Sequence, residues 1–457
     1  MRSIKRYSQK IVLLLIALGS TAIFYWYGFH KTFDKKCIPK NADAVVILDV
    51  KNMRNYFAYS ILQNPTEWPS IAKTSGIKKR LDLSNFGIEI ADYYSFFHVE
   101  NQPVHRWFVV AKIEDVSIFN QALVKAHFVK TKINQTLFGY YSKSLKLLIL
   151  QDCKEILCCL NAANLQQNDI QIAENLFRKH RYFDFKKIEK SIESSNALTI
   201  WIKKNNMLQD DGIINVALGE QEITARGKLV WKSEYQKTNV FIQNPNALCS
   251  FGINFGMIRN QNLFRRHLKQ INSIVGFNIN SILAHHPTKT EFIFNGMVEK
   301  KDSAISYQYD EDFNPIQKVI VHYSREPSFF FSIQTDTSSK VFAYLKSQKV
   351  IDNHQVFVNF PLAVTKVFVK NNSLAFEANF SKSLEIKNTV PKIAYLQIHF
   401  NKIQPNDWNF LIKKNKKISF LKPFKSFEMT FRTINNSENF QARLVTKRKK
   451  NIVEILN

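Results

Sequence analysis

The pattern of apolar and polar positions predicts short β-strands joined by hairpins along most of this chain. Pairs of apolar runs flank turn-forming residues at Lys143–Ser144, Gly219–Gln221, Asn371–Asn372 and Asn435–Ser437. Glycine and asparagine tolerate the positive φ angles that tight hairpin turns need. The 38 phenylalanines suit the filled cores of β-rich lobes. We therefore expect antiparallel, hairpin-rich sheets.

The same order of elements occurs twice, which indicates a weak internal duplication. The first half opens with NADAVVILDVKNMRNYF and the second half opens with NALCSFGINFGMIRNQNLF. Further along, FVVAKIEDVSIFNQALVK (108–125) corresponds to FFFSIQTDTSSKVFAYLK (329–346). Each of these two segments predicts an apolar strand, then an aspartate that caps a helix, then an amphipathic helix.

The two predicted helices have similar apolar faces. The expected caps are Asp115 and Asp336. Positions three, four and seven residues apart lie on one side of a helix, so each helix presents one apolar stripe to a sheet. The stripe residues are Val116, Phe119, Leu123 and Ala126 in the first helix, and Val341, Phe342 and Leu345 in the second.

These elements predict an α+β fold of two related lobes. Each lobe is expected to be an antiparallel hairpin-rich sheet with helices packed on one face. The lobes span 41–236 and 246–447, with the boundary in the polar stretch QKTNVFIQNPN, and the first lobe carries an extra helical insert at about 153–193. The alternative is one large continuous sheet through both halves.

An apolar run at 11–29, IVLLLIALGSTAIFYWYGF, precedes the lobes. As a helix of about 19 residues it is roughly 28 Å long, which is enough to cross a hydrocarbon core of about 30 Å. We expect a transmembrane anchor that stays uncut, and a signal peptide cleaved near Ser20–Ala22 is the alternative. The expected anchor and interface residues are Arg2, Lys5, Arg6, Lys10, Trp26 and Tyr27.

The anchor sets the expected location. A short basic N-terminus ahead of such a helix stays in the cytoplasm, so we expect a cytoplasmic tail at 1–10, a spacer at 30–40, and the bulk of the chain in the periplasm. The protein is then a single-pass protein of the inner membrane. A basic tail at 448–457 closes the chain.

The charge is strongly basic: 64 Lys and Arg against 37 Asp and Glu give a net charge of +27. One interpretation is attraction to anionic lipid or another polyanion. The other is a lysine-rich coding bias with charges spread over solvated faces, and the scattered lysines favour it. No RNA- or DNA-binding motif accompanies the charge, so we do not expect a nucleic-acid partner.

The polar residues form no catalytic constellation. The chain contains no G-x-S-x-G, H-E-x-x-H, G-x-x-x-x-G-K-[ST] or G-x-G-x-x-G motif. We therefore expect no enzymatic activity, no cofactor and no bound metal. The residues that we interpret as turns or loops, or to which we assign no role, are His285–His286, Asp310–Asp312, Asp210–Gly212, His98, His105 and Arg106.

The cysteines number five, and an odd count this small does not make a disulfide scaffold. Three of them lie in CKEILCC, whose spacing fits neither a zinc knuckle nor a redox pair. We interpret Cys37, Cys153, Cys158, Cys159 and Cys249 as small, buried, apolar residues.

A family resemblance adds to this picture. The anchor, the spacer and the stretch from PKNADAVVILDV to QNPTEW, with Asn64, Pro65 and Trp68, resemble uncharacterised single-pass envelope proteins of Bacteroidota-type bacteria. The resemblance covers residues 39–69 and implies an envelope location, but no activity and no site residues.

Together these observations predict a membrane-anchored, extracytoplasmic structural or interaction protein of the bacterial envelope, with another envelope protein as its partner. The alternative is a carrier or sensor of an amphiphilic, lipid-like ligand held between sheet and helices. An enzyme with an unfamiliar site is the third class. A cavity of several hundred Å³ lined by phenylalanine would favour the ligand carrier.

Overall fold

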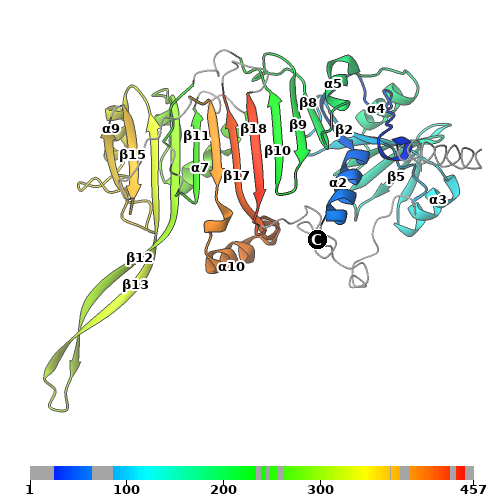
Figure 1. Ribbon diagram of the computed structural model, residues 1–457. Helices are drawn as coiled ribbons and strands as arrows, with labels where there is room; N and C mark the ends of the chain where they lie inside the picture. Colours follow the sequence, from blue (N-terminus) through cyan, green and yellow to red (C-terminus); the bar gives the residue numbers. More distant parts are fainter. Residues whose placement is uncertain are drawn as a thin grey trace, which may run out of the picture. The chain divides into compact units, whose positions relative to one another are not determined.

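The computed structural model describes residues 25–63, 86–232, 238–242, 244, 246–255, 262–370, 372–380, 391–432 and 439–447 (Figure 1). The chain divides into two compact units. Unit 1 contains the described residues up to Lys204 and Asp210–Ala225, and unit 2 contains Asn205–Gln209 and the described residues from Arg226 to Lys447. Strand β10 (Glu222–Lys228) begins in unit 1 and ends in unit 2.

Unit 1 is built on an antiparallel sheet. Its strands pair in the order β9–β8–β1–β2–β3–β7–β6–β5–β4. Their bounds are β1 (Ala42–Asp49), β2 (Tyr93–Val99), β3 (Trp107–Lys112), β4 (Val129–Lys132), β5 (Leu137–Ser142), β6 (Leu147–Asp152), β7 (Glu155–Leu160), β8 (Leu198–Ile202) and β9 (Gly212–Leu218).

Helices cover both faces of this sheet. The helices of unit 1 are α2 (Val50–Gln63), α3 (Val116–Lys125), α4 (Gln167–Phe177), η4 (Phe185–Lys187) and α5 (Glu189–Ile192). Helix α4 packs over Phe97, Phe108 and Leu157, whereas α3 packs over Ile156 and Ile149. Leu157 and Ile156 are neighbours in β7, and successive strand residues point to opposite faces. The expectation of helices on one face only is therefore wrong for unit 1.

Unit 2 has its own antiparallel sheet, in the order β18–β17–β16–β11–β12–β13–β15–β14. The strands are β11 (Cys249–Asn254), β12 (Lys289–Tyr309), β13 (Pro315–Gln334), β14 (Lys366–Lys370), β15 (Ser373–Ala378), β16 (Ala394–Ile398), β17 (Phe424–Phe431) and β18 (Phe440–Thr446). Its helices are α7 (Asn262–Val275), α8 (Ile279–Leu283), α9 (Ser338–Ser347), η6 (Phe400–Lys402), α10 (Pro405–Lys414) and η7 (Lys416–Leu421).

The two units share one pairing scheme. The first strand of each unit, β1 or β11, pairs with the next strand and with a strand near the end of the unit, β8 or β16. The third strand, β3 or β13, is followed by a helix and then pairs with the second strand of a later hairpin, β7 or β15.

A long two-stranded ribbon is the main departure of unit 2 from this scheme. The outer halves of β12 and β13, here called the arm (297–326), extend away from the rest of the unit (Figure 1). A register shift between Phe294 and Gly296 marks its base. Gly296 has φ +113°, which side chains rarely permit, and such bulges bend a strand out of its sheet.

Several predictions from sequence need correction. In the described chain strands contain more residues than helices and the fold is mostly β, so the α+β class is wrong. No helix in the described part of the chain is long and apolar enough to cross a membrane. That finding contradicts the single-pass, inner-membrane placement from which the periplasmic location was inferred. Residues 11–24 of the expected anchor lie outside the described residues, and residues 25–28 form one short helical turn.

Some of the predicted caps and turns are confirmed and others are wrong. Asp115 does cap α3, because its carboxylate accepts hydrogen bonds from the Ser117 and Ile118 amides at 2.8 and 3.0 Å. Asp336 does not cap α9, whose cap position is Thr337. The turns at Gly219–Gln221 and at Asn372 are confirmed, whereas Asn435–Ser437 lies outside the described residues.

The CKEILCC segment was predicted to open a helical insert, and this is wrong. Residues 155–160 form strand β7, and the helices of this region begin only at Gln167. Alternation of Ile156, Leu157 and Cys159 between two covered faces explains the continuous apolar run.

Candidate functional site

A row of phenylalanines on neighbouring strands of unit 2 forms the floor of a pocket. Phe292 and Phe294 of β12 lie directly opposite Phe331 and Phe329 of β13. Phe331 in turn lies opposite Phe376 of β15. Residues two apart on a strand share a face, so all five rings point to the same side of the sheet.

Loop residues form the walls. Phe277 follows α7, and Phe357 and Phe360 follow α9. The ring of Phe360 lies 5.3 Å from that of Phe329, and the ring of Phe357 lies 5.4 Å from that of Phe376, centroid to centroid. These edge-on contacts are the geometry that aromatic pairs prefer.

A glycine lets the two wall loops meet. Gly276 has φ +76°, and a Cβ at this position would lie 2.3 Å from the side-chain nitrogen of Asn359. Any other residue would both strain the backbone and push the loops apart. The position of Phe277 therefore depends on Gly276.

The pocket has a volume of about 350 Å³, and its lining is almost wholly apolar. Pro327 and Thr365 complete it, and the Thr365 hydroxyl is already used, because it donates to the Ala363 carbonyl at 3.2 Å. Apart from Phe376, the rings are only partly buried. A pocket of this size is at the lower end of the range for small-molecule sites.

The chemistry of this pocket is that of an apolar binding site. Among the described residues, no side chain that can titrate lines it, so this part of the chain offers the pocket no general acid, base or nucleophile. Apolar cavities of about 150 Å³ already bind a benzene-sized molecule. This one has room for a longer apolar group, such as part of an acyl chain.

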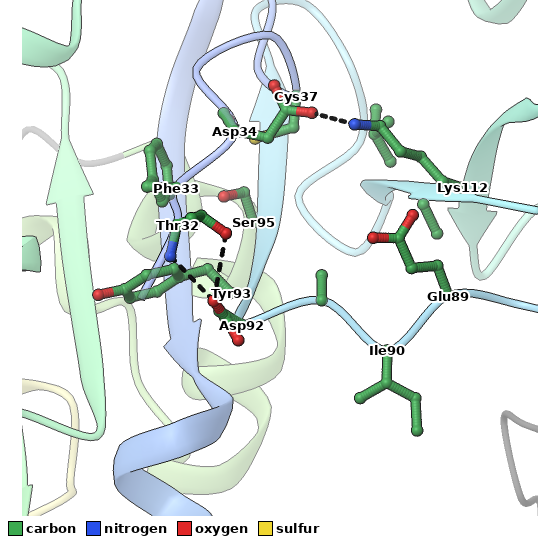
Figure 2. A pocket seen from close by; sticks show the side chains of 13 residues that line it. Thr32, Phe33, Asp34, Cys37, Glu89, Ile90, Asp92, Tyr93, Ser95 and Lys112 are labelled. Carbon is green, nitrogen blue, oxygen red and sulfur yellow. Dashed lines mark hydrogen bonds and ion pairs between the residues drawn. The ribbon is translucent and has the colours of Figure 1, made fainter. Parts of the chain in front are cut away.

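A second pocket, of about 360 Å³, lies in unit 1 between residues 32–37 and strands β2 and β3 (Figure 2). Its lining is mixed. Figure 2 shows the Asp34 carboxylate facing Lys112, at 2.8 Å, and the Asp92 carboxylate accepting from Thr32, at 2.9 Å from the backbone nitrogen.

Asp34 and Cys37 are two groups of this second pocket that could take part in covalent chemistry. Burial alone would raise the pKa of Asp34, but hydrogen bonds from Lys112 and the Lys36 amide outweigh it and lower the pKa. Burial raises the pKa of the Cys37 thiol to about 11. A protonated thiol is a poor nucleophile, so this pocket does not support covalent catalysis.

The expected membrane residues fall partly outside the described chain. Arg2, Lys5, Arg6 and Lys10 lie outside it. Trp26 and Tyr27 are exposed, and the Trp26 ring stacks on His30 at 4.2 Å. The expected spacer packs on unit 1, where Lys31 forms an ion pair with Asp49 at 2.5 Å.

Arg106 has a structural role that the sequence did not reveal. Its guanidinium donates to Asp169 at 2.6 Å, and both side chains are almost fully buried. Asp169 also accepts from the Gln166 amide at the start of α4. The pair therefore fastens α4 to the strand that begins at Trp107. His98 pairs with Asp43 at 2.6 Å.

The other polar candidates lie in turns. Asp310 accepts from the Asp312 and Asn314 amides at the tip of the arm, as expected for a hairpin turn. His285 contacts the Thr337 hydroxyl at 2.8 Å, and Asp211 pairs with Lys187 at 2.7 Å. Among the residues that the structure describes, no three His, Cys, Asp or Glu side chains are grouped to hold a metal ion.

The cysteines are all free thiols. Cys159 is buried, as predicted, whereas Cys153 is exposed in the turn before β7, which is a correction. Burial raises the pKa of Cys158 to about 12 and that of Cys159 to about 11.

Sequence reasoning missed the phenylalanine pocket as a site. The alternation in EFIFNG and SFFFSI places rings on one sheet face, but the same alternation is typical of a filled core. Phe277, Phe357 and Phe360 lie in loops, and nothing in their spacing indicates that they meet.

Comparison with known proteins gives little. No known family's sequence profile matches the chain, and no curated protein matches it. The solved structures that match include crystal form IV of TP0453, at 11% identity and a TM-score of 0.26, covering 41% of this chain and 77% of that one. Crystal form III of TP0453 matches at 8% identity and a TM-score of 0.24, covering 76% and 93%. Likeness at this level supports no inference about fold or function.

Proposed function

We propose that this protein is a carrier or sensor that binds the apolar part of an amphiphilic molecule in the phenylalanine pocket of unit 2. The observation that carries the proposal is a pocket of about 350 Å³ whose described lining residues offer eight phenylalanine rings and no titratable group. Exposed apolar concavities of this kind are uncommon on folded proteins unless a ligand or partner uses them.

The ligand that fits best is a single acyl chain with a polar head left in solvent. Part-exposed rings at the mouth leave room for a head group outside the pocket. Burying a methylene group contributes about 0.8 kcal/mol, which is about a fourfold gain in affinity. Affinity should therefore rise with chain length until the pocket is full, and then stop rising.

The test is a binding titration of the full chain with fatty acids of increasing length. We expect saturable binding, one ligand per chain, with the rise and plateau described above. Phe360→Asp places a charge on the wall of the pocket and should weaken binding at least about tenfold. Phe410→Asp is the matched control, because Phe410 is 62% exposed on α10 and lines no part of the pocket.

Two results would refute the proposal. One is an affinity that keeps rising with chain length in both variants, as for non-specific adsorption to the protein surface. The other is equal binding by Phe360→Asp and Phe410→Asp. Either result would mean that the phenylalanine pocket is not the binding site.

A second candidate function, docking of a partner protein, is favoured by the arm. Alternation places the large apolar side chains of its outer half mainly on one face. These are Ile305, Tyr307, Tyr309, Val319, Val321 and Tyr323, each at least 39% exposed. A two-stranded ribbon alone is marginally stable in water, so an apolar face on such a ribbon is a surface suited to a partner.

The two faces of the arm give this candidate a matched test. A photo-crosslinking side chain at Tyr307 should capture a protein partner in cells, whereas the same side chain at Gln308, on the other face, should not. Equal capture from both positions, or none from either, would remove the docking function.

A further inference from the structure

A polar pocket lies on the other face of the unit 2 sheet. Phe251 pairs with Phe292 and Leu396, whereas its neighbour Gly252 pairs with Glu291 and Tyr395. Because strand neighbours point to opposite faces, Tyr395 lies on the side away from the phenylalanine pocket. The pocket has a volume of about 280 Å³, and its polar lining is Lys392, Tyr395, Gln397, Glu428, Thr430, Arg432, Gln441 and Arg443.

Lys392 is the unusual member of this lining. It is only 8% exposed, and its ammonium group lies 5.3 Å from the centre of the Tyr395 ring. Within the described residues no carboxylate forms an ion pair with it. Burying a lysine ammonium group without an ion-pair partner is unfavourable.

The position of Lys392 is firmly set by its neighbours. Its backbone exchanges two hydrogen bonds with Asn239, at 2.8 and 3.0 Å. The Tyr395 hydroxyl donates to the Ile242 carbonyl at 2.8 Å. Gly252 makes room for this packing, because a Cβ there would lie 2.3 Å from the Phe241 ring. These contacts fix the backbone of Lys392 and the Tyr395 ring beside which its ammonium group lies.

The other charges make the pocket cationic. Arg432 and Arg443 line it beside Lys392, and Glu428 is the one acidic side chain among the described residues of the lining. Gln397 donates to Glu428 at 3.4 Å. Burial lowers the pKa of Lys392 and repulsion from Arg432 lowers it further, whereas attraction to Glu428 partly opposes the fall. A bound anion would relieve that repulsion.

We propose that this pocket binds a phosphate-type oxyanion. Lys392 and the two arginines supply the positive charge, and guanidinium groups match the oxygen geometry of such anions. Thr430 and Gln441 supply further hydrogen-bond donors. The phosphate group is either free or the head group of a lipid, and this site is separate from the apolar pocket on the opposite face.

The experiment is calorimetric titration of the full chain with inorganic phosphate, with ionic strength held constant by chloride. We expect saturable binding at one site per chain. Lys392→Met and Arg432→Gln should each weaken binding at least about tenfold, and Lys413→Met, an exposed lysine on α10, should leave it unchanged.

Thermal unfolding without phosphate separates a binding lysine from a structural one. Lys392→Met removes a buried charge that forms no ion pair with a described carboxylate, so it should raise Tm by about 2–4 °C. A fall in Tm together with unchanged phosphate binding would overturn the proposal, because Lys392 would then be a structural residue. Absence of saturable phosphate binding by the wild-type chain, and of phosphatidic acid vesicle binding that depends on Lys392, would overturn it as well.

Vesicles containing phosphatidic acid distinguish the two sources of phosphate. Binding of vesicles but not of inorganic phosphate, lost in Lys392→Met, assigns the site to a lipid head group. Binding of both assigns it to the phosphate group in general. Fatty-acid binding should be the same in Lys392→Met as in the wild type, so failure of this proposal leaves the phenylalanine pocket untouched.

Discussion

Two pairs of phenylalanines, one in each unit, have the same local structure and different surroundings. Phe97 lies opposite Phe108 on strands β2 and β3, and Phe292 lies opposite Phe331 on β12 and β13. Phe97 and Phe108 are 0% exposed, whereas Phe292 and Phe331 are only partly buried. Ring type and cross-strand pairing therefore do not decide whether a phenylalanine belongs to a core or to a site.

The two pairs differ in the helices that pack over them. In unit 1 the connection from β7 to β8 carries α4, whose Ile172, Ala173 and Leu176 pack onto the Phe97–Phe108 face. In unit 2, Val341 and Leu345 of α9 pack toward β14 and β15 at one end of the sheet. Phe292 and Phe294 lie beyond that contact and line the pocket. The pocket therefore forms where the helical cover of the aromatic sheet face is incomplete.

The largest expected effect is a difference in unfolding free energy between a core variant and a pocket variant. Phe108→Ala leaves a cavity in a closed core and should lower the free energy of unfolding by up to about 5 kcal/mol. Phe331→Ala removes a ring that is already partly in solvent, so its loss should be about 1–2 kcal/mol. Urea unfolding of the two variants measures both values, and equal losses would contradict the comparison.

The next effect concerns the ion pair that holds the cover of unit 1. Arg106→Met leaves Asp169 buried without its partner and should lower stability by about 3–4 kcal/mol at neutral pH. Adding Asp169→Asn to this variant should restore most of the loss. No recovery in the double variant would mean that the pair contributes little.

The loss of stability in Arg106→Met should also depend on pH. Burial already raises the pKa of Asp169, although the Gln166 amide and Arg106 oppose that rise. A raised folded-state pKa gives stability at low pH that is lost as pH rises through it. Removal of Arg106 raises that pKa further, so the deficit of Arg106→Met should shrink as the pH falls from 7 toward 4.

A bound fatty acid should slow hydrogen exchange only in the strands that form the phenylalanine pocket. At a fatty-acid concentration about 100 times Kd, hydrogen exchange of amides that open only when the ligand leaves should slow by up to about 100-fold. We expect this in peptides that contain 292–294 and 329–331, and no change in peptides from β2 and β3. Mass spectrometry of deuterated peptides distinguishes this result from a uniform slowing.

The smallest effect concerns the alkylation of two cysteines. Cys159 is buried in the closed core and its pKa is raised to about 11, so iodoacetamide at pH 8 should leave it unmodified in the folded chain. Cys153 is exposed and should react. Alkylation of both at similar rates would show that the core of unit 1 opens readily.

Local features of this chain were readable from sequence because they depend on neighbours along the chain. The cap at Asp115 and the turn at Asn372 follow from side-chain chemistry within a few residues. Asp336 failed as a cap although its segment has the same pattern, because the first turn of α9 begins one residue later.

Features that depend on contacts between residues far apart in the chain could not be predicted from the sequence. Arg106 and Asp169 are far apart in sequence, and each alone resembles an ordinary surface charge. Lys392 became notable only once its burial was known. The helical insert was placed too early because the apolar run at 155–160 fits a buried strand as well as a helix, and periodicity does not separate the two.

The most direct test of the central claim is photo-labelling of the full chain with a fatty acid that carries a diazirine near the end of its chain, followed by peptide mapping. The account predicts labels concentrated at 292–294, 329–331 and 357–360, and their loss with excess unlabelled fatty acid. Labels confined to the arm, or spread evenly over both units, would contradict the claim that the phenylalanine pocket holds the ligand.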